Sequence, residues 1–170
     1  MNKSLKILIA IYVLIVTGMC GHDYKAVSQK DSITVYCDTL SAALYHADKV
    51  TINRLLTNCD QVKASYRYVH PSECVSNIYH SFLFHIIRDV YNTNYTPLSN
   101  SQVEYYIDLY SWDCIAHALY IGDINQVKVL IKNLEKHNRV SQVINSCQYK
   151  GSYLRDIARR HCKDALKLLH

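Results

Sequence analysis

Histidine and cysteine side chains are the groups of this chain that most readily do chemistry, and its 170 residues include nine His and seven Cys. His80 and His85 are five positions apart, so on a helix they point in different directions and do not share a metal ion as an i, i+4 pair would. Cys162 directly follows His161, and neighbouring residues of a helix diverge by about 100°. We therefore predict that neither pair forms a catalytic or metal site.

The sequence patterns of known catalytic and cofactor sites are also absent. The chain contains no HExxH metal-binding pattern, no GxSxG nucleophile turn, no P-loop and no GxGxxG dinucleotide pattern. We predict a non-enzymatic protein without catalytic residues, cofactor or metal. The alternative is a small hydrolase whose site, such as a Cys–His pair, is assembled only by folding.

The number and spacing of the cysteines predict disulfides, not a metal site. Six cysteines follow Cys20: Cys37, Cys59, Cys74, Cys114, Cys147 and Cys162. An even number in an exported chain is typical of up to three disulfides, whose connectivity the sequence does not give. The absence of CxxC pairs counts against a structural zinc site or a thioredoxin-like redox pair. The alternative is that the thiols are free and buried as small apolar side chains.

The C-terminal end of the chain is basic. The net charge is −4 over residues 22–124 and +7 over residues 125–170. Four basic residues recur every fourth position opposite an apolar face: Arg155, Arg159, Lys163 and Lys167. Such a face can bind an anionic surface, but without interleaved aromatic residues a solvated face is the commoner case. We expect no nucleic-acid partner.

Two segments 75 residues apart match each other and predict the elements of the fold. Residues 38–56 read DTLSAALYHADKVTINRLL and residues 113–131 read DCIAHALYIGDINQVKVLI. In each, an apolar stripe at helical spacing is followed by Ala-Asp or Gly-Asp and then by a second stripe. Asp48 and Asp123 are predicted to cap the second helices. Each segment is therefore predicted to form a helical hairpin, too small to bury its own apolar face without a neighbour.

The regions around the two hairpins are less regular. Residues 21–36 show no helical stripe and are predicted to be irregular. Residues 73–111 form the central unit, with a strong helical stripe from Val75 to Val90, an exposed loop over residues 92–101 and a shorter helix around residues 103–110. Asn94-Tyr95-Thr96 is a glycosylation acceptor pattern, which matters only in a eukaryotic secretory route.

The chain from Gly122 to the C-terminus resembles the ankyrin repeat. Gly122-Asp123, Val127 and Leu130-Ile131 look like that family's glycine, valine and paired leucines, and residues 143–145 followed by Gly151 look like its Val-Asn turn and glycine. Where the family has a glycine between the last two helices this chain has His161, so residues 153–169 could equally form one helix. The resemblance implies an all-α fold of stacked helical hairpins, an ankyrin-like solenoid with an irregular central unit.

In the ankyrin family the turn tips and the first-helix faces bind partner proteins. The resemblance places such contacts at five residues of this chain: His46, His117, Ile121, Gln148 and Tyr149. The 15 Tyr against two Phe fit a contact surface, because Tyr is amphipathic, and equally fit half-buried helix faces.

The N-terminus has the composition of a secretory signal peptide. Lys3 and Lys6 precede an apolar run over residues 7–16 and small residues around Gly18 and Cys20. Cleavage is expected near Gly18 to Cys20, because the apolar run is shorter than the roughly 18 residues that span a membrane. An uncleaved anchor and a lipid-modified Cys20 are the alternatives. The predicted organisation is a signal peptide over residues 1–20, an irregular segment over residues 21–36 and a helical repeat domain over residues 37–170.

Taken together, the sequence predicts a secreted or periplasmic, monomeric protein that binds another protein through ankyrin-like hairpins. A secreted effector acting on a host or neighbouring-cell protein extends this by analogy. Two alternatives come from other classes. One is a small disulfide-stabilised helical protein whose basic C-terminal helix binds anionic surfaces, and the other is the small hydrolase named above.

Overall fold

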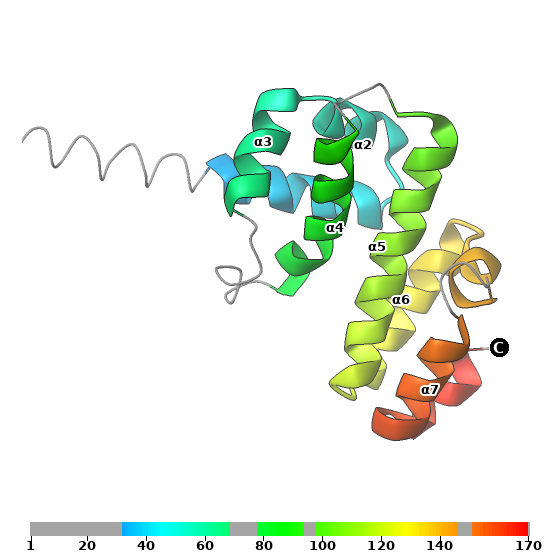
Figure 1. Cartoon of the computed structure of the whole chain (residues 1–170). Helices are drawn as coiled ribbons and strands as arrows, with labels where there is room; N and C mark the ends of the chain where they lie inside the picture. The colour runs from blue at the N-terminus through cyan, green and yellow to red at the C-terminus, as the bar shows by residue number, and fades with distance from the viewer. Residues whose placement is uncertain (1–31, 69–77, 94–97, 146–150, 170) are drawn as a thin grey trace, which may run out of the picture. The chain divides into compact units, whose positions relative to one another are not determined.

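The computed structural model describes residues 32–68, 78–93, 98–145 and 151–169 (Figure 1). Every secondary-structure element within these ranges is helical, as the sequence predicts, and none of them is a strand. The chain divides into two compact units, residues 1–35 and residues 36–170. Within the first unit, residues 32–35 are described and are helical. The following paragraphs concern the second unit.

The second unit begins with a helical stretch over residues 36–45, followed by α2 (Lys49–Leu56). The remaining helices are α3 (Cys59–Tyr68), α4 (Ile78–Asn92), α5 (Asn100–Tyr120), α6 (Ile124–Lys136), the π-helical turn η1 (Ser141–Asn145), α7 (Gly151–His161) and the 3₁₀ helix η3 (Lys163–Leu168). The prediction of an irregular segment is wrong for residues 32–36, which are helical. Helix α3 was not predicted.

The two matching segments adopt the same conformation at their turns. Ala47 and Gly122, 75 residues apart, both have a left-handed backbone, with φ of 52° and 76°. The N–H groups of Asp48 and Asp123 each donate a 2.9 Å hydrogen bond to the carbonyl oxygen five positions earlier. This pattern is a Schellman turn, which satisfies the last carbonyls of a helix.

Each turn passes directly into a capped helix. The carboxylates of Asp48 and Asp123 accept hydrogen bonds of 3.1 and 3.0 Å from the backbone N–H three positions later. The prediction that these two aspartates are N-caps is confirmed. Helix α6 also ends in a Schellman turn, with Asn138 at φ 55° and the Arg139 N–H donating to the Leu134 carbonyl at 2.9 Å.

Helix α5 runs continuously for 21 residues through the predicted boundary between the central unit and the second hairpin. A capping box starts it, because the Ser99 hydroxyl accepts from the Gln102 N–H and the Gln102 side chain accepts from the Ser99 N–H at 2.8 Å. No Gly or Pro occurs between residues 100 and 120 to end it. The prediction of a shorter helix around residues 103–110 is therefore wrong, because α5 spans Asn100–Tyr120.

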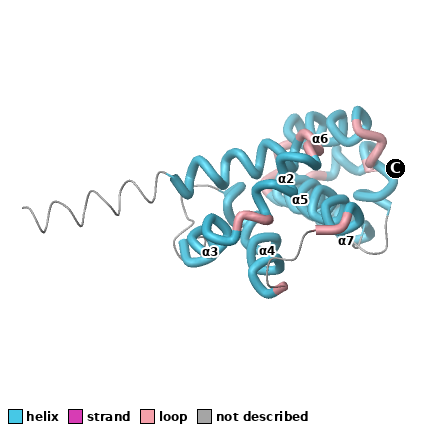
Figure 2. Tube along the Cα trace, turned by 90° about the horizontal axis from the view of Figure 1, so that it is seen from above, coloured by secondary structure: helices cyan, strands magenta, loops and turns pink. Residues whose placement is uncertain are grey.

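Helix α5 is the central element of the unit. Figures 1 and 2 show it between α4 and α6, and it contacts α2, α4, α6, α7 and η1. Its buried residues cover more than half of the circumference of the helix: Val103, Tyr106, Ile107, Asp108, Tyr110, Ser111, Cys114, Ile115, Ala118 and Leu119. A helix with so wide a buried face needs neighbours on several sides, whereas the face with residues 105, 109, 112, 116 and 120 is not buried.

A charge network fixes α5 to the elements on one side of it. The Arg139 guanidinium donates to the Asp108 carboxylate at 2.8 Å, pairs with the Glu104 carboxylate and donates to the Glu104 backbone oxygen at 3.0 Å. Lys49, the first residue of α2, pairs with the same Glu104 side chain. Both cations hold the pKa of Glu104 below its ordinary value, with the Lys49 hydrogen bond the largest cause.

The C-terminal region forms two helical elements and not the single helix over residues 153–169 that the sequence also allowed. Helix α7 ends at His161 and η3 starts at Lys163, so residues 153–169 are two elements and not one helix. The His161 backbone oxygen lies 3.3 Å from the position that a Cβ on Gly122 would occupy. This end of α7 therefore packs closely on the turn between α5 and α6.

At the two equivalent turns we predict substitutions that change the free energy of unfolding in opposite directions. Gly122→Ala forces a side chain into a left-handed conformation beside the His161 oxygen, so we expect a loss of about 1–2 kcal/mol in the free energy of unfolding. Ala47→Gly relieves the same conformation, and we expect a gain of about 0.5–1 kcal/mol. Urea unfolding monitored by circular dichroism measures both. A change of the same sign in the free energy of unfolding for both substitutions would show that the two turns do not share this conformation.

Candidate functional site

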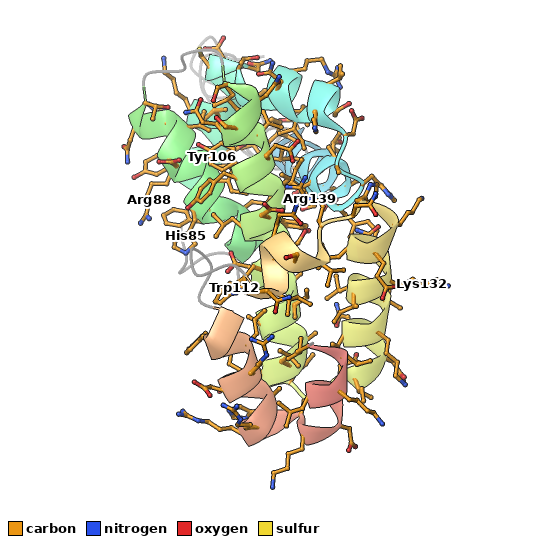
Figure 3. The ribbon with its side chains drawn as sticks, turned by 90° about the vertical axis from the view of Figure 1, so that its right-hand side faces the viewer. His85, Arg88, Tyr106, Trp112, Lys132 and Arg139 are labelled. Atoms are coloured by element: carbon orange, nitrogen blue, oxygen red, sulfur yellow. The ribbon has the colours of Figure 1, made fainter. Side chains whose placement is uncertain are left out.

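An open groove of about 680 Å³ lies between α4 and α5. Four of its lining residues come from α4 and four from α5: His85, Arg88, Asp89 and Asn92, then Tyr105, Tyr106, Leu109 and Asp113. Figure 3 shows His85, Arg88 and Tyr106 on the same side of the molecule. The groove is thus lined by both signs of charge together with tyrosine rings.

The amphipathic pattern of α4 directs its polar side chains to the groove. Leu83, Ile86, Ile87 and Val90 are at most 1% exposed and fix one face of the helix in the core. The groove residues of α4 follow the i, i+3, i+4, i+7 spacing of a single helix face: His85, Arg88, Asp89 and Asn92. The core packing of α4 therefore sets the positions of all four side chains.

Hydrogen bonding and burial fix the groove where the two helices meet. The Tyr106 hydroxyl donates to the Asp89 carboxylate at 2.6 Å, which joins α5 to α4. Tyr106 is 1% exposed. Burial first, and the neighbouring Asp89 second, raise the pKa of Tyr106 above its ordinary value. The phenol therefore stays protonated and remains the donor in this hydrogen bond.

Arg88 lies along an aromatic cluster. Its guanidinium carbon is 5.6 Å from the centre of the Phe84 ring, and its Nη2 lies 3.3 Å from Nδ1 of His85, to which it can donate. Tyr66 stacks on Phe84 and on Tyr91, with ring centres 6.1 and 4.3 Å apart. Burial first, and Arg88 second, lower the pKa of His85. The imidazole is therefore neutral at physiological pH.

Asp113 differs from the other charged residues of the groove. Its side chain is half-buried, and no hydrogen bond or ion pair joins its carboxylate to another residue in the described part of the chain. Burial raises its pKa to about 6. At neutral pH the groove therefore contains a carboxylate that has lost hydration without gaining a counter-ion from the described residues.

A second groove of about 500 Å³ lies between α6 and the end of the helical stretch over residues 36–45. It is lined by Tyr45, Val129, Lys132, Asn133, Glu135 and Lys136. The Asn133 side-chain amide donates to the Tyr45 carbonyl at 2.7 Å, which connects the two hairpins. Figure 3 shows Lys132 pointing away from the body of the unit.

The contact residues implied by the ankyrin resemblance lie elsewhere. His46 is exposed at the first turn, His117 is half-buried on α5, and Ile121 is 54% exposed after α5. Gln148 and Tyr149 lie outside the described residues. None of these residues lines the α4–α5 groove. The i, i+3, i+4, i+7 spacing of His85, Arg88, Asp89 and Asn92 is the signal in the sequence that indicates this polar face of α4.

The four basic residues of the C-terminal end do not share one continuous helix. Arg155 and Arg159 lie on α7, whereas Lys163 and Lys167 lie on η3. The Arg155 guanidinium donates to the Leu169 carbonyl at 3.0 Å and to the Asn145 side chain at 2.7 Å, and Arg159 pairs with Asp156 at 2.5 Å. Two of the four charges therefore take part in contacts within the unit.

The structure contains no disulfide among the described cysteines. Cys37, Cys59, Cys114 and Cys162 are thiols, whereas Cys74 and Cys147 lie outside the described residues. The prediction of up to three disulfides is therefore wrong for Cys37, Cys114 and Cys162, which are buried thiols and pack as small apolar side chains, as in the alternative. Burial is the main cause that raises the pKa of the Cys114 thiol to about 12, so this thiol is not a nucleophile.

No group of three or more His, Cys, Asp and Glu side chains within the described ranges is arranged to hold a metal ion. Likewise, none of the described helices combines the length and the apolar character that crossing a bilayer requires. The apolar run over residues 7–16 lies outside the described residues.

Comparisons with protein-family models, with curated proteins and with solved structures gave no significant match to this chain.

The buried Asp113 predicts how stability depends on pH. Its folded-state pKa of about 6 lies above the ordinary 3.8, so its unfavourable contribution develops as the pH rises from about 4 to above 6. We expect Asp113→Asn to be about 2 kcal/mol more stable than the parent above this range and little different below it. Urea unfolding at both ends of the range measures the difference.

The control for this substitution is Asp38→Asn. Asp38 occupies the equivalent position of the first matching segment, where its side chain is exposed. A stability difference for Asp113→Asn that stays constant with pH would show that Asp113 is not desolvated as described.

Proposed function

We propose that this chain is an exported, non-enzymatic protein-binding module that holds a segment of another protein in the α4–α5 groove. The observation that carries the proposal is the groove itself, which is open and is lined by tyrosine, arginine and carboxylate side chains on two packed helices. Its volume of about 680 Å³ suits several side chains of an incoming segment.

The side chains at the groove are those that protein interfaces favour. Tyr105 lines it with 36% of its surface exposed, and Tyr91, at the end of the aromatic stack, is 37% exposed. Arg88 is held over Phe84. Tyr and Arg are enriched at the centres of interfaces because each combines a large contact area with hydrogen bonding.

The chemistry of the groove favours binding over catalysis. The described lining residues include neither Ser, Thr nor Cys, so they supply no side chain of the kinds that most often act as nucleophiles. The adjacent Cys114 is buried, and its thiol stays protonated. Tyr106 and Asp89 are engaged with each other. These residues suit the recognition of a partner better than the attack on a substrate.

The frame that carries the groove is proposed to be an ankyrin-like solenoid. The equivalent turns at Ala47 and Gly122, the matching caps and the Asn133 hydrogen bond between the hairpins support this arrangement. In the ankyrin family such frames bind proteins, and a host or neighbouring-cell protein is the partner class that the analogy extends to.

Export is the second part of the proposal, and the composition of residues 1–20 supports it. Expression in a bacterial host with export competence is expected to yield a protein outside the cytoplasm that begins near residue 21. Intact-mass measurement of the purified protein tests this. A full-length mass recovered only from the cytoplasm would contradict export.

A display library of short random peptides, selected on the immobilised protein, tests protein binding. We expect enriched peptides whose affinity falls about tenfold or more in Tyr105→Ser and in Arg88→Ser, because truncation at the centre of an interface costs above about 1 kcal/mol. Val50→Ser is the control, since Val50 is 80% exposed on α2 and does not line the groove.

Circular dichroism of each variant establishes that it is folded before its affinity is compared. The proposal would be abandoned if no peptide were enriched, or if the enriched peptides bound the groove variants and the parent equally.

A further inference from the structure

The charged residues of the α4–α5 groove differ in whether another described residue contacts their charged groups. Asp89 accepts the Tyr106 hydroxyl, and Arg88 is engaged with the Phe84 ring and His85. The Asp113 carboxylate has no hydrogen-bond or ion-pair partner among the described residues, although it is half-buried. An acidic group in this situation lowers stability at neutral pH, so a group supplied from outside is the natural partner for it.

The side chains of α5 that line the groove form one stripe that ends at Asp113. Tyr106, Leu109 and Asp113 follow the i, i+3, i+7 spacing of a helix face, and Tyr105 lies beside the first of them. Along this stripe the chemistry changes from aromatic to aliphatic to anionic. A lysine or arginine side chain has the matching order, with an apolar stem that packs on Leu109 and a cationic head that reaches a carboxylate.

The balance of charge in the groove also favours a cation. At neutral pH the described lining contributes one positive charge, Arg88, and two negative charges, Asp89 and Asp113, while His85 is neutral. An anionic ligand would meet both carboxylates. A cationic side chain would meet Asp113, which has no competing partner among the described residues.

We propose that the protein segment bound in the α4–α5 groove places a lysine or arginine side chain against Asp113, with its stem on Leu109. This inference rests on the proposed function and adds the chemistry of the partner. Asp113 is then the residue that selects a basic segment over a neutral or acidic one, and the cation compensates a carboxylate that has no partner among the described residues.

The test compares two displayed peptide libraries, one random and one that contains neither Lys nor Arg. Groove-dependent binders, defined by loss of binding to Tyr105→Ser, are expected from the first library and not from the second. Each enriched peptide is then made with its basic residue changed to Gln. Affinities for the parent, Asp113→Asn and Asp38→Asn are measured by isothermal titration calorimetry.

We expect Asp113→Asn to weaken the basic peptides about tenfold or more, as loss of a charge-assisted contact does. The same substitution should leave the Gln-substituted peptides unchanged, so that a double-mutant cycle isolates the pair. Asp38→Asn, on the exposed equivalent position, should leave all affinities unchanged. Because Asp113→Asn is expected to be more stable than the parent at neutral pH, unfolding does not explain a loss of binding.

The outcomes separate this inference from the proposed function. Groove-dependent peptides that bind Asp113→Asn as tightly as the parent, or that emerge equally from the library without Lys and Arg, overturn the inference and leave the protein-binding function standing. The absence of groove-dependent peptides from both libraries overturns the function and the inference together.

Discussion

The burial of the wide apolar face of α5 is the constraint on which the rest of the structure depends. A helix of 21 residues whose buried side chains cover more than half of its circumference is stable in water only when several other elements pack on it. Helices α2 and α6, with η1 and α7, cover part of its surface, and α4 covers another part. The buried polar residue Asp108 is tolerated because Arg139 pairs with it. The Schellman turns and aspartate caps then fix where the neighbouring helices start and end.

The candidate site follows from the place where α5 is covered least completely. Helix α4 packs with its apolar face toward the core, and its polar face turns toward α5 across the groove. The hydrogen bond from Tyr106 to Asp89 joins the two helices there, and Asp113 lies on the α5 wall without a partner of its own in the described chain. The scaffold thus holds a desolvated carboxylate in a fixed position, which is a preorganised arrangement for an incoming cation.

Local sequence signals were sufficient for the all-α class, for the caps at Asp48 and Asp123 and for the core face of α4, because each depends on residues within a few turns of one another. The continuity of α5 was missed because the match between segments suggested a boundary at residue 113, whereas helix continuity depends on the absence of a breaker. The groove was not predictable in the same way. The partial burial of Asp113 depends on tertiary packing around the groove. The state of Cys37, Cys114 and Cys162 likewise depends on distances between helices, which the spacing of the cysteines does not contain.

A crystal structure of the chain with an enriched basic peptide tests the central claim most directly, because it locates both the segment and its charged side chain. The account predicts that the peptide lies between α4 and α5, with a lysine or arginine nitrogen within hydrogen-bond distance, about 2.7–3.2 Å, of an Asp113 carboxylate oxygen. A peptide seated on another surface, or a neutral side chain opposite Asp113, would contradict it.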